Sequence, residues 1–243
     1  MIPRIINAWI DRMFLVFFLI LMLIGAYTTY DTWYVRNVSS GKSLYVFRPE
    51  EDNPEAYTKL SREAVAWITV PDTTLDYPIM QTDNNTKYLN TAPDGSYSLA
   101  GSIFLDFSCD PLFGDTYTLI YGHHMADGMM FGSLDLFAEK GYFDAHRDAY
   151  LTFGGKSHKA RIFAMMYTDA REQAIFDPAH NQDPYDFIRA HAMYFDEPVS
   201  KDRIVALSTC KEPGSTERTI VFLSFRPDGT ETQSAGEKEI ENA

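Results

Sequence analysis

Basic residues and cysteines are both scarce in this sequence. The 243 residues include 21 Lys and Arg against 34 Asp and Glu, which gives a formal net charge of −13. Such a balance argues against a nucleic-acid or anionic-lipid surface for the domain as a whole. With only two cysteines, Cys109 and Cys210, the chain can form one internal disulfide at most, and their spacing does not decide whether it does. No internal repeat is found.

Long apolar runs are also rare, and a single one stands out near the N-terminus. Residues 13–30, MFLVFFLILMLIGAYTTY, carry no charge, and at about 1.5 Å per residue they would nearly cross a hydrocarbon core of about 30 Å. Arg4 and Arg12 precede the run and Asp31 follows it, so the positive-inside rule places the N-terminus in the cytoplasm. A cleaved signal peptide is the alternative, but no A-x-A-like site follows the run. We therefore expect an uncleaved single-pass anchor in the cell membrane, with the rest of the chain outside the cell.

Composition divides the chain into five parts. The predicted parts are a cytoplasmic N-terminus (1–12), a transmembrane anchor (13–30), a juxtamembrane stalk with N-terminal helices (31–63), a globular domain (64–225) and a flexible acidic tail (226–243). The tail is rich in Pro, Asp, Gly, Thr, Glu and Ser and has almost no large apolar residue, which is typical of a solvated segment. About 200 residues are left for one ordinary globular domain.

Short β-type runs dominate the globular part, whereas helical signals are few. Eight runs are rich in β-branched and aromatic residues: AWITV, YPIM, GSIFLDF, YTLIYGH, YLTF, KARIFAMMYT, RIVALSTC and RTIVFLSF. The GGKS stretch between the fifth and sixth runs predicts a hairpin turn. Helices are predicted at NNTKYLN, MFGSLDLF and PYDFIRAHAMYF. Strands at this spacing with sparse helices favour a mainly β fold, a barrel rather than a βαβ sheet.

Two strand ends carry the residues best suited to chemistry. Cys210 ends the run RIVALSTC, whereas Cys109 lies in the turn-rich segment FSCDPLFGD. A thiol attacks as thiolate, and its ordinary pKa of about 8.5 makes a nearby base or positive charge useful. His123 follows another strand and could transfer protons. Arg218 comes eight residues after Cys210 across a turn, so an antiparallel hairpin would bring its guanidinium near the sulfur, where it could stabilise an oxyanion.

Taken singly, each of these residues has an ordinary structural interpretation. A lone Cys in a strand is usually a small core residue, a His after Gly is usually a turn residue, and an Arg after a turn is usually solvated. The whole set, however, resembles the class B sortases, the cell-wall transpeptidases of Gram-positive bacteria. The resemblance covers residues 64–225 and depends on four segments in order: AWITVPDTTLDYPIMQTDNNTKYLN, AGSIFLDF, TLIYGHHMADGMMFGSL and IVALSTCKEPGSTERTIV.

The resemblance implies a fold, an activity and roles for named residues. It implies an eight-stranded sortase β-barrel with an N-terminal helical extension and a helix before the seventh strand. His123 would be the catalytic histidine, Cys210 the nucleophile and Arg218 the essential arginine. The residues implied to bind the sorting signal are Asn85, Leu89, Tyr121, Ser208, Thr209 and Glu212. For Leu89 and Tyr121 a plain core position is the alternative.

The implied reaction is cleavage of a C-terminal sorting signal on exported proteins, followed by transfer of the acyl group to an amine. The amine would belong to a peptidoglycan cross-bridge or to a pilin lysine. Two positions depart from the family pattern: Lys211 replaces a residue that is often acidic, and Glu212 stands where an aspartate is common. These departures leave the chemistry intact and put substrate contacts in question.

Several alternatives remain open at this point. Alternation along a strand would point His124 away from His123, so His124 is expected to pack or to form a hydrogen bond. Adjacent histidines are poor zinc co-ligands, and no metal or other cofactor is expected. A membrane-anchored extracellular cysteine protease would use the same Cys and His, although papain-like chains place the Cys first. A non-catalytic β-barrel binding module is the other alternative.

Overall fold

A computed structural model describes residues 2–39, 42–125, 128–201, 203–210 and 215–226. For residues 2–8, 35–39, 42 and 210 it describes the backbone alone. Lys211 and Glu212 lie outside the described residues, as does most of the predicted tail. Arg226, which was assigned to that tail, donates from Nε to the carbonyl of Val199 at 2.9 Å and so belongs to the folded domain.

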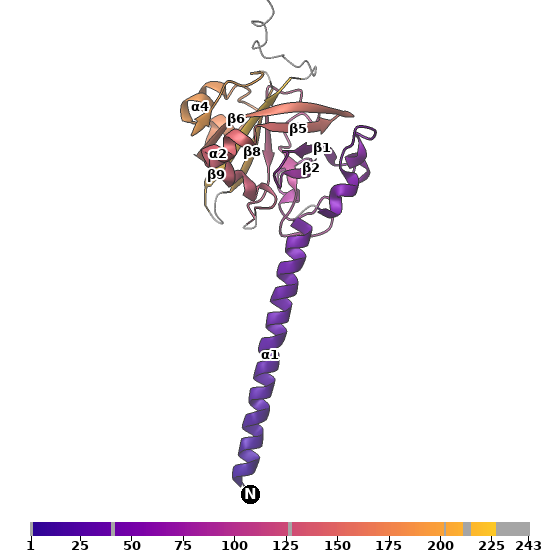
Figure 1. Ribbon diagram of the computed structural model, residues 1–243, viewed down its shortest axis with the longest axis vertical. Coiled ribbons are helices and arrows are strands. Elements are labelled where there is room, and N and C mark those ends of the chain that lie inside the picture. The colour runs from indigo at the N-terminus through magenta and orange to yellow at the C-terminus, as the bar shows by residue number, and fades with distance from the viewer. Residues whose placement is uncertain (1, 40–41, 126–127, 202, 211–214, 227–243) are drawn as a thin grey trace, which may run out of the picture.

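In the described part of the chain, one sheet contains every named strand (Figure 1). The strands are β1 (Ala64–Thr69), β2 (Asp76–Met80), β3 (Ile103–Leu105), β4 (Tyr117–Tyr121), β5 (Asp148–Phe153), β6 (Lys156–Asp169), β7 (Tyr194–Phe195), β8 (Ile204–Cys210) and β9 (Glu217–Phe225). Their order is β5-β1-β2-β3-β4-β8-β9-β6-β7, and β5 also pairs with β6. This pairing closes eight strands into a barrel and leaves β7 outside, on β6. The predicted eight-stranded barrel is confirmed.

The predicted GGKS hairpin is confirmed as well. Phe153 in β5 pairs with Lys156 in β6, so only Gly154 and Gly155 form the turn. Both glycines have positive φ, +55° and +74°. This is the backbone that a tight hairpin requires and that residues with a Cβ rarely adopt.

The barrel buries side chains on both of its faces. Inward residues such as Ile68, Leu151 and Val221 form the interior core together with other large apolar side chains. A second cluster on the outer face includes Phe222 of β9 and Ile188 of the helix above it. Because strands alternate their side chains between faces, a stretch such as IVFL (220–223) in β9, which is apolar at every position, indicates burial on both sides.

The helical elements are short except for the first. They are α1 (Ile2–Ser39), η1 (Lys42–Phe47), η2 (Ala56–Lys59), η3 (Lys87–Leu89), η4 (Phe131–Ala138), α2 (Lys140–Ala145), α3 (Gln173–Phe176) and α4 (Tyr185–His191). The predicted N-terminal helical extension corresponds to the 3₁₀ helices η1 and η2, and MFGSLDLF also forms a 3₁₀ helix. The helix predicted before the seventh barrel strand is α4. It ends earlier than expected, because the chain turns extended at Ala192 (ψ 138°), and Tyr194 and Phe195 then pair with β6 as β7.

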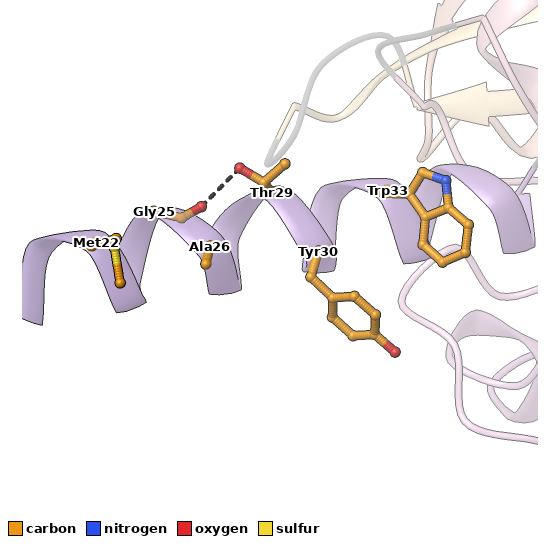
Figure 2. A pocket seen from close by; sticks show the side chains of 6 residues that line it. All are labelled: Met22, Gly25, Ala26, Thr29, Tyr30 and Trp33. Atoms are coloured by element: carbon orange, nitrogen blue, oxygen red, sulfur yellow. Dashed lines mark hydrogen bonds between the residues drawn. The ribbon is translucent and has the colours of Figure 1, made fainter. Parts of the chain in front are cut away.

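Helix α1 extends away from the barrel as a single rod (Figure 1). Residues Trp9–Tyr34 are long and apolar enough to cross a membrane, and none of that stretch is buried in the protein. Hydroxyl groups in this helix bond to its own backbone: Thr29 donates to the Gly25 carbonyl at 2.7 Å (Figure 2). Such bonds lower the cost of placing a hydroxyl group in apolar surroundings. The helix continues past Tyr30, so the first residues of the predicted stalk are part of it.

The N-terminal extension is held to the barrel by a buried carboxyl group. Asp76 accepts from Trp67 Nε1 and Thr69 Oγ1, both at 2.8 Å. Its second oxygen lies 3.0 Å from Nε of Arg48, which follows η1. Buried carboxyl groups are tolerated when their acceptors are filled in this way, so the contact favours one placement of the extension.

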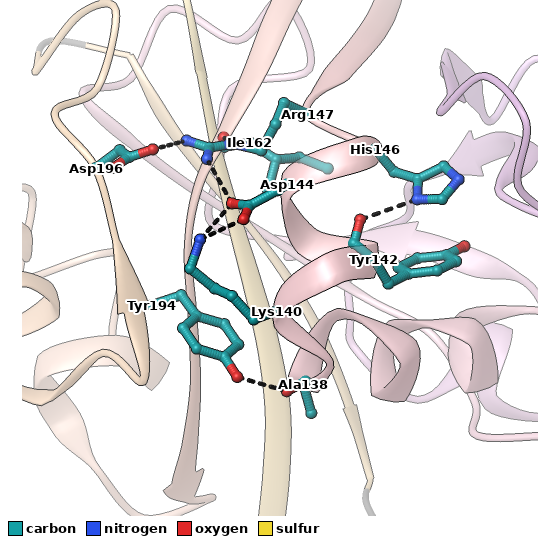
Figure 3. Close-up of polar contacts among 9 residues, drawn as sticks. All are labelled: Ala138, Lys140, Tyr142, Asp144, His146, Arg147, Ile162, Tyr194 and Asp196. Carbon is teal, nitrogen blue, oxygen red and sulfur yellow. Dashed lines mark hydrogen bonds and ion pairs between the residues drawn. The ribbon is translucent and has the colours of Figure 1, made fainter.

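Arg147, which follows α2, joins its own segment to β6 and to the residues beyond β7 (Figure 3). Its Nε donates to the Ile162 carbonyl of β6 at 2.6 Å, and its guanidinium pairs with Asp196 beyond β7. Tyr194 of β7 in turn donates to the Ala138 carbonyl at 2.9 Å. These bonds hold the short strand β7, which pairs with β6 through only two residues, against η4 and against the segment that follows α2.

Candidate active site

The carboxyl ends of β4 and β8 meet at one end of the barrel. The two strands are parallel neighbours, with Tyr121 opposite Ser208, and the Gly122 amide donates to the Ser208 carbonyl at 3.1 Å. His123 and Cys210 each follow this pair by two residues. The topology thus brings two distant segments of the sequence to the same rim.

Arg218 reaches the same rim from β9. Strands β8 and β9 are antiparallel, and Cys210 lies directly opposite Arg218 in their register. The predicted hairpin is therefore confirmed. Arg218 is half-buried and its Nη1 donates to the carbonyls of Ser215 and Glu217 at 2.8 and 3.2 Å. These bonds fix one edge of the guanidinium against the turn.

A groove of about 380 Å³ opens at this rim. Five residues that the resemblance assigned to the sorting signal line it, together with His123 and Arg218. The lining residues are Asn85, Leu89, Phe104, Tyr121, Gly122, His123, Ala170, Phe176, Ser208, Thr209 and Arg218. Sequence reasoning missed Phe104, Ala170 and Phe176, which carry no signal beyond their apolar character.

His123 is oriented by a backbone carbonyl. Its Nε2 lies 2.7 Å from the oxygen of Leu89 in η3. A carbonyl only accepts, so Nε2 carries the proton in this arrangement and Nδ1 is the basic atom of the neutral ring. The backbone before the ring is tightly packed, because a Cβ at Gly122 would lie 2.7 Å from the ring of Phe131. Only glycine fits there without movement of its neighbour.

The two cysteines have different surroundings, as the sequence indicated. Cys109 is a free thiol in the interior core, and burial raises its pKa to about 12. It stays protonated at neutral pH and is a poor nucleophile. Cys210 ends β8 at the groove rim, and its side chain lies outside the described atoms.

The polar lining of the groove contains one unsatisfied group. Ser208 is 2% exposed, and its Oγ has no hydrogen-bond partner among the described residues. A buried hydroxyl without a partner is costly unless a ligand or water supplies the missing hydrogen bond.

The two groove residues with a core position as their alternative interpretation differ in exposure. Leu89 is 38% exposed, so it is not a core residue, and Tyr121 is half-buried.

Asp106 supports this lining from behind and was missed by sequence reasoning. Asp106 is 4% exposed, and its carboxyl group accepts from Asn85 Nδ2 at 2.8 Å and from the Tyr121 hydroxyl at 3.1 Å. Burial, followed by the charge of Asp106, raises the pKa of Tyr121, so the phenol keeps its proton and donates. A charged residue closing the apolar run GSIFLDF was the signal that could have indicated it.

His124 has a structural partner of its own. Its Nε2 lies 2.9 Å from Oδ2 of Asp135 in η4, and the other oxygen of Asp135 accepts from Thr219 at 2.7 Å. Asp135 thereby links His124, which follows His123, to Thr219, which follows Arg218. His124 forms a hydrogen bond as expected. Among the described residues, no group of three His, Cys, Asp or Glu side chains is placed to hold a metal ion.

Comparison with known proteins identifies the same part of the chain. Residues 68–225 match the profile of the sortase domain. Sortase B of Listeria monocytogenes is 34% identical over 158 residues, which cover 63% of this chain and 64% of the relative. Sortase B of Staphylococcus aureus is 30% identical over 181 residues, 70% of this chain and 73% of the relative. The chain thus covers slightly less than two thirds of the Listeria protein.

Solved structures with this fold include two pilus enzymes of streptococci. A Streptococcus pyogenes class B sortase involved in pilus biogenesis has a TM-score of 0.63 at 35% identity, covering 70% of this chain and 96% of that chain. Sortase B from the type II pilus of Streptococcus pneumoniae has a TM-score of 0.59 at 34% identity, covering 69% and 95%. A Staphylococcus aureus sortase B–substrate complex shares the fold, with a TM-score of 0.65 at 24% identity, covering 82% of this chain and 97% of that one.

Proposed function

The chain belongs to the sortase family, within its class B, and from this premise we propose that it is a cysteine transpeptidase acting on exported proteins. The observation that carries the proposal is the register of β8 and β9, which places Cys210 opposite Arg218 at the rim of the groove that His123 also lines. Nucleophile, proton carrier and fixed positive charge then share one site. That combination suits acyl transfer through a thioester.

In the first half-reaction the thiolate of Cys210 attacks the carbonyl carbon after the Thr of a sorting signal. The C–N bond breaks, the departing amine takes a proton from His123, and a thioester remains on the sulfur. Arg218 stabilises the oxyanion of the tetrahedral intermediate. The Nε2 bond to Leu89 leaves Nδ1 of His123 as the atom that gains and gives the transferred proton.

In the second half-reaction an incoming amine attacks the thioester. His123 takes the proton that the amine loses, Arg218 again stabilises the oxyanion, and the C–S bond breaks to release the thiolate. The net result is one amide exchanged for another, without an oxidant or an external energy source. The amine acceptor is a peptidoglycan cross-bridge or a pilin lysine, and the class B relatives from streptococcal pili make the second worth testing directly.

Helix α1 supports a proposed location for this chemistry. Its apolar stretch would anchor the protein by one span, with residues 1–12 in the cytoplasm, residues 13–30 in the bilayer and the domain of residues 64–225 outside. Residues 31–63 connect the two. An anchor confines the enzyme to the surface where exported proteins emerge, which raises the rate of encounter.

A cleavage assay on the full-length chain in detergent tests the proposal. A peptide library is offered with a glycine peptide or a lysine peptide as acceptor, and products are read by mass spectrometry. Ligated product is expected with the wild type and with Cys109→Ala, the matched change at the other cysteine, and none with Cys210→Ala. Hydrolysis without ligation would indicate a cysteine protease instead. Full activity of Cys210→Ala would refute the proposed nucleophile.

A further inference from the structure

Asp106 lies just behind the groove without lining it. It follows β3, is 4% exposed, and contacts two of the lining residues through its side chain. We propose that Asp106 is a positioning residue that holds Asn85 and Tyr121 in the orientation that receives the sorting signal. This inference rests on the proposed function of the groove.

The Asp106 carboxyl group accepts four hydrogen bonds from described residues, two on each oxygen. Its Oδ2 accepts from Asn85 Nδ2 and from the Tyr121 hydroxyl. Its Oδ1 accepts from the amide and the hydroxyl of Ser108, at 2.9 and 2.6 Å. The amide of Asp106 donates to the Leu119 carbonyl at 2.9 Å, so its backbone is held by β4. The carboxyl group is therefore fixed before any substrate arrives.

Asn85 is clamped at both ends of its side-chain amide. Nδ2 donates to Asp106 at 2.8 Å, and Oδ1 accepts from the Phe107 amide at 2.9 Å. These two partners define which way the amide faces and leave it no alternative flip that keeps both bonds. An amide held in this way can present a defined polar surface to a peptide backbone in the groove.

Tyr121 is fixed by its ring and by its hydroxyl. The ring packs against Phe104, with centroids 5.4 Å apart, and the hydroxyl donates to Asp106 at 3.1 Å. Because Asn85 and Tyr121 share one oxygen of Asp106, a change at this carboxyl group moves two walls of the groove together. Preorganised groove walls reduce the ordering cost of binding.

A purely structural role is the competing explanation, and Asp76 provides the control for it. Asp76 is also a buried carboxyl group, 8% exposed, and accepts from two side-chain donors. Its partners Trp67, Thr69 and Arg48 lie outside the groove. Asp106→Asn and Asp76→Asn therefore make the same chemical change at similar burial, and only the first touches groove residues.

Steady-state cleavage by the full-length chain in detergent tests the inference, with the peptide selected from the library. In Asp106→Asn the backbone amide of Ser108 keeps its bond to the remaining side-chain oxygen. The new NH₂ group therefore faces the Asn85 and Tyr121 donors, which lose their acceptor. KM is expected to rise about ten-fold with kcat within about two-fold. Asp76→Asn is expected to lower Tm and leave KM unchanged. The double variant Asn85→Ala with Asp106→Asn is expected to have a KM within about two-fold of the KM of Asn85→Ala alone.

Ser108→Ala keeps the test decisive if Asp106→Asn does not fold. This change removes one hydroxyl bond to Oδ1 and is expected to raise KM about two-fold. An unchanged KM in whichever of these variants folds would overturn the inference, as would an equal rise in Asp76→Asn. A wild type that neither binds nor cleaves any peptide would instead contradict the proposed function, so the two failures are distinguishable.

Discussion

The Nε2 atom of His123 lies 2.7 Å from the carbonyl oxygen of Leu89, and that carbonyl packs directly against Gly101. A Cβ at Gly101 would lie 2.7 Å from the Leu89 oxygen and 2.4 Å from the Tyr88 oxygen. The orientation of the His123 ring therefore depends on Gly101, because a side chain there would displace the Leu89 carbonyl.

Gly101→Ala is expected to impair the chemical step. Its φ of +59° is unfavourable for alanine, which costs about 1 kcal/mol of stability, and the added methyl group also displaces the Leu89 carbonyl. A displaced ring should lower kcat about ten-fold, because proton transfer requires close alignment. Gly95→Ala is the matched control, since φ is +87° there and nothing lies within 4 Å of its Cβ. Equal kcat values in the two variants would contradict the dependence on Leu89.

Arg218→Lys is expected to lower kcat by about 100-fold while KM changes little. The guanidinium of Arg218 donates through Nη1 to the carbonyls of Ser215 and Glu217 and has further N–H groups for an oxyanion, whereas the single ammonium of lysine cannot reproduce this fork. Arg171→Lys is the control, because Arg171 is exposed and pairs with Asp169. Full kcat in Arg218→Lys would mean that charge alone is sufficient.

Most of the barrel could be predicted from the sequence because burial on one or both faces dictates β-type runs. All eight predicted runs form strands, and the GGKS turn pairs β5 with β6. Strand β7 escaped prediction because its two residues continue a helical pattern and pair only through the tertiary structure. Helices α2 and α3 have six and four residues, too short for a periodic pattern to indicate them.

The candidate site could be predicted only where motif residues define it. His123, Cys210 and Arg218 stand in recognisable segments, and the topology brings those segments together. Asp106 and Asp135 act through other side chains, so their importance depends on contacts between segments distant in sequence. Their roles, like those of the groove residues, remain predictions.

Thiol labelling is expected to modify one cysteine in the folded protein. Burial raises the pKa of Cys109 to about 12, so at pH 8 its reactive thiolate is a minute fraction, and the core shields its sulfur. Iodoacetamide should therefore add one group to the wild type and to Cys109→Ala, and none to Cys210→Ala until it is unfolded. Mass spectrometry of the intact chain reads the result. A disulfide between the two cysteines, or labelling of Cys109 in the folded state, would contradict this expectation.

Acid should weaken the attachment of η3, the helix that supplies the Leu89 carbonyl. Glu63 lies beside β1 and binds Lys87 and Tyr88 of η3, and these hydrogen bonds, with Lys87 the larger cause, lower the pKa of Glu63. A lowered folded-state pKa means that the contribution to stability is complete above the ordinary value of about 4.3 and is lost as the pH falls through the folded pKa. Glu63→Gln should therefore reduce the free energy of unfolding at pH 7 by less than about 1 kcal/mol, since solvent screens the pair.

The difference between Glu63→Gln and the wild type is the measurement that decides this last point. Urea unfolding at pH 7, about 5 and about 3.5 should give a difference that is constant over the first two values and shrinks at the third, where the wild-type carboxyl group also becomes neutral. Glu51→Gln, an exposed position in the N-terminal extension, should show no such trend. If the Glu63→Gln difference instead grew on acidification, the carboxyl group would destabilise the fold when ionised, and its contacts with η3 could not be what holds the Leu89 carbonyl toward His123.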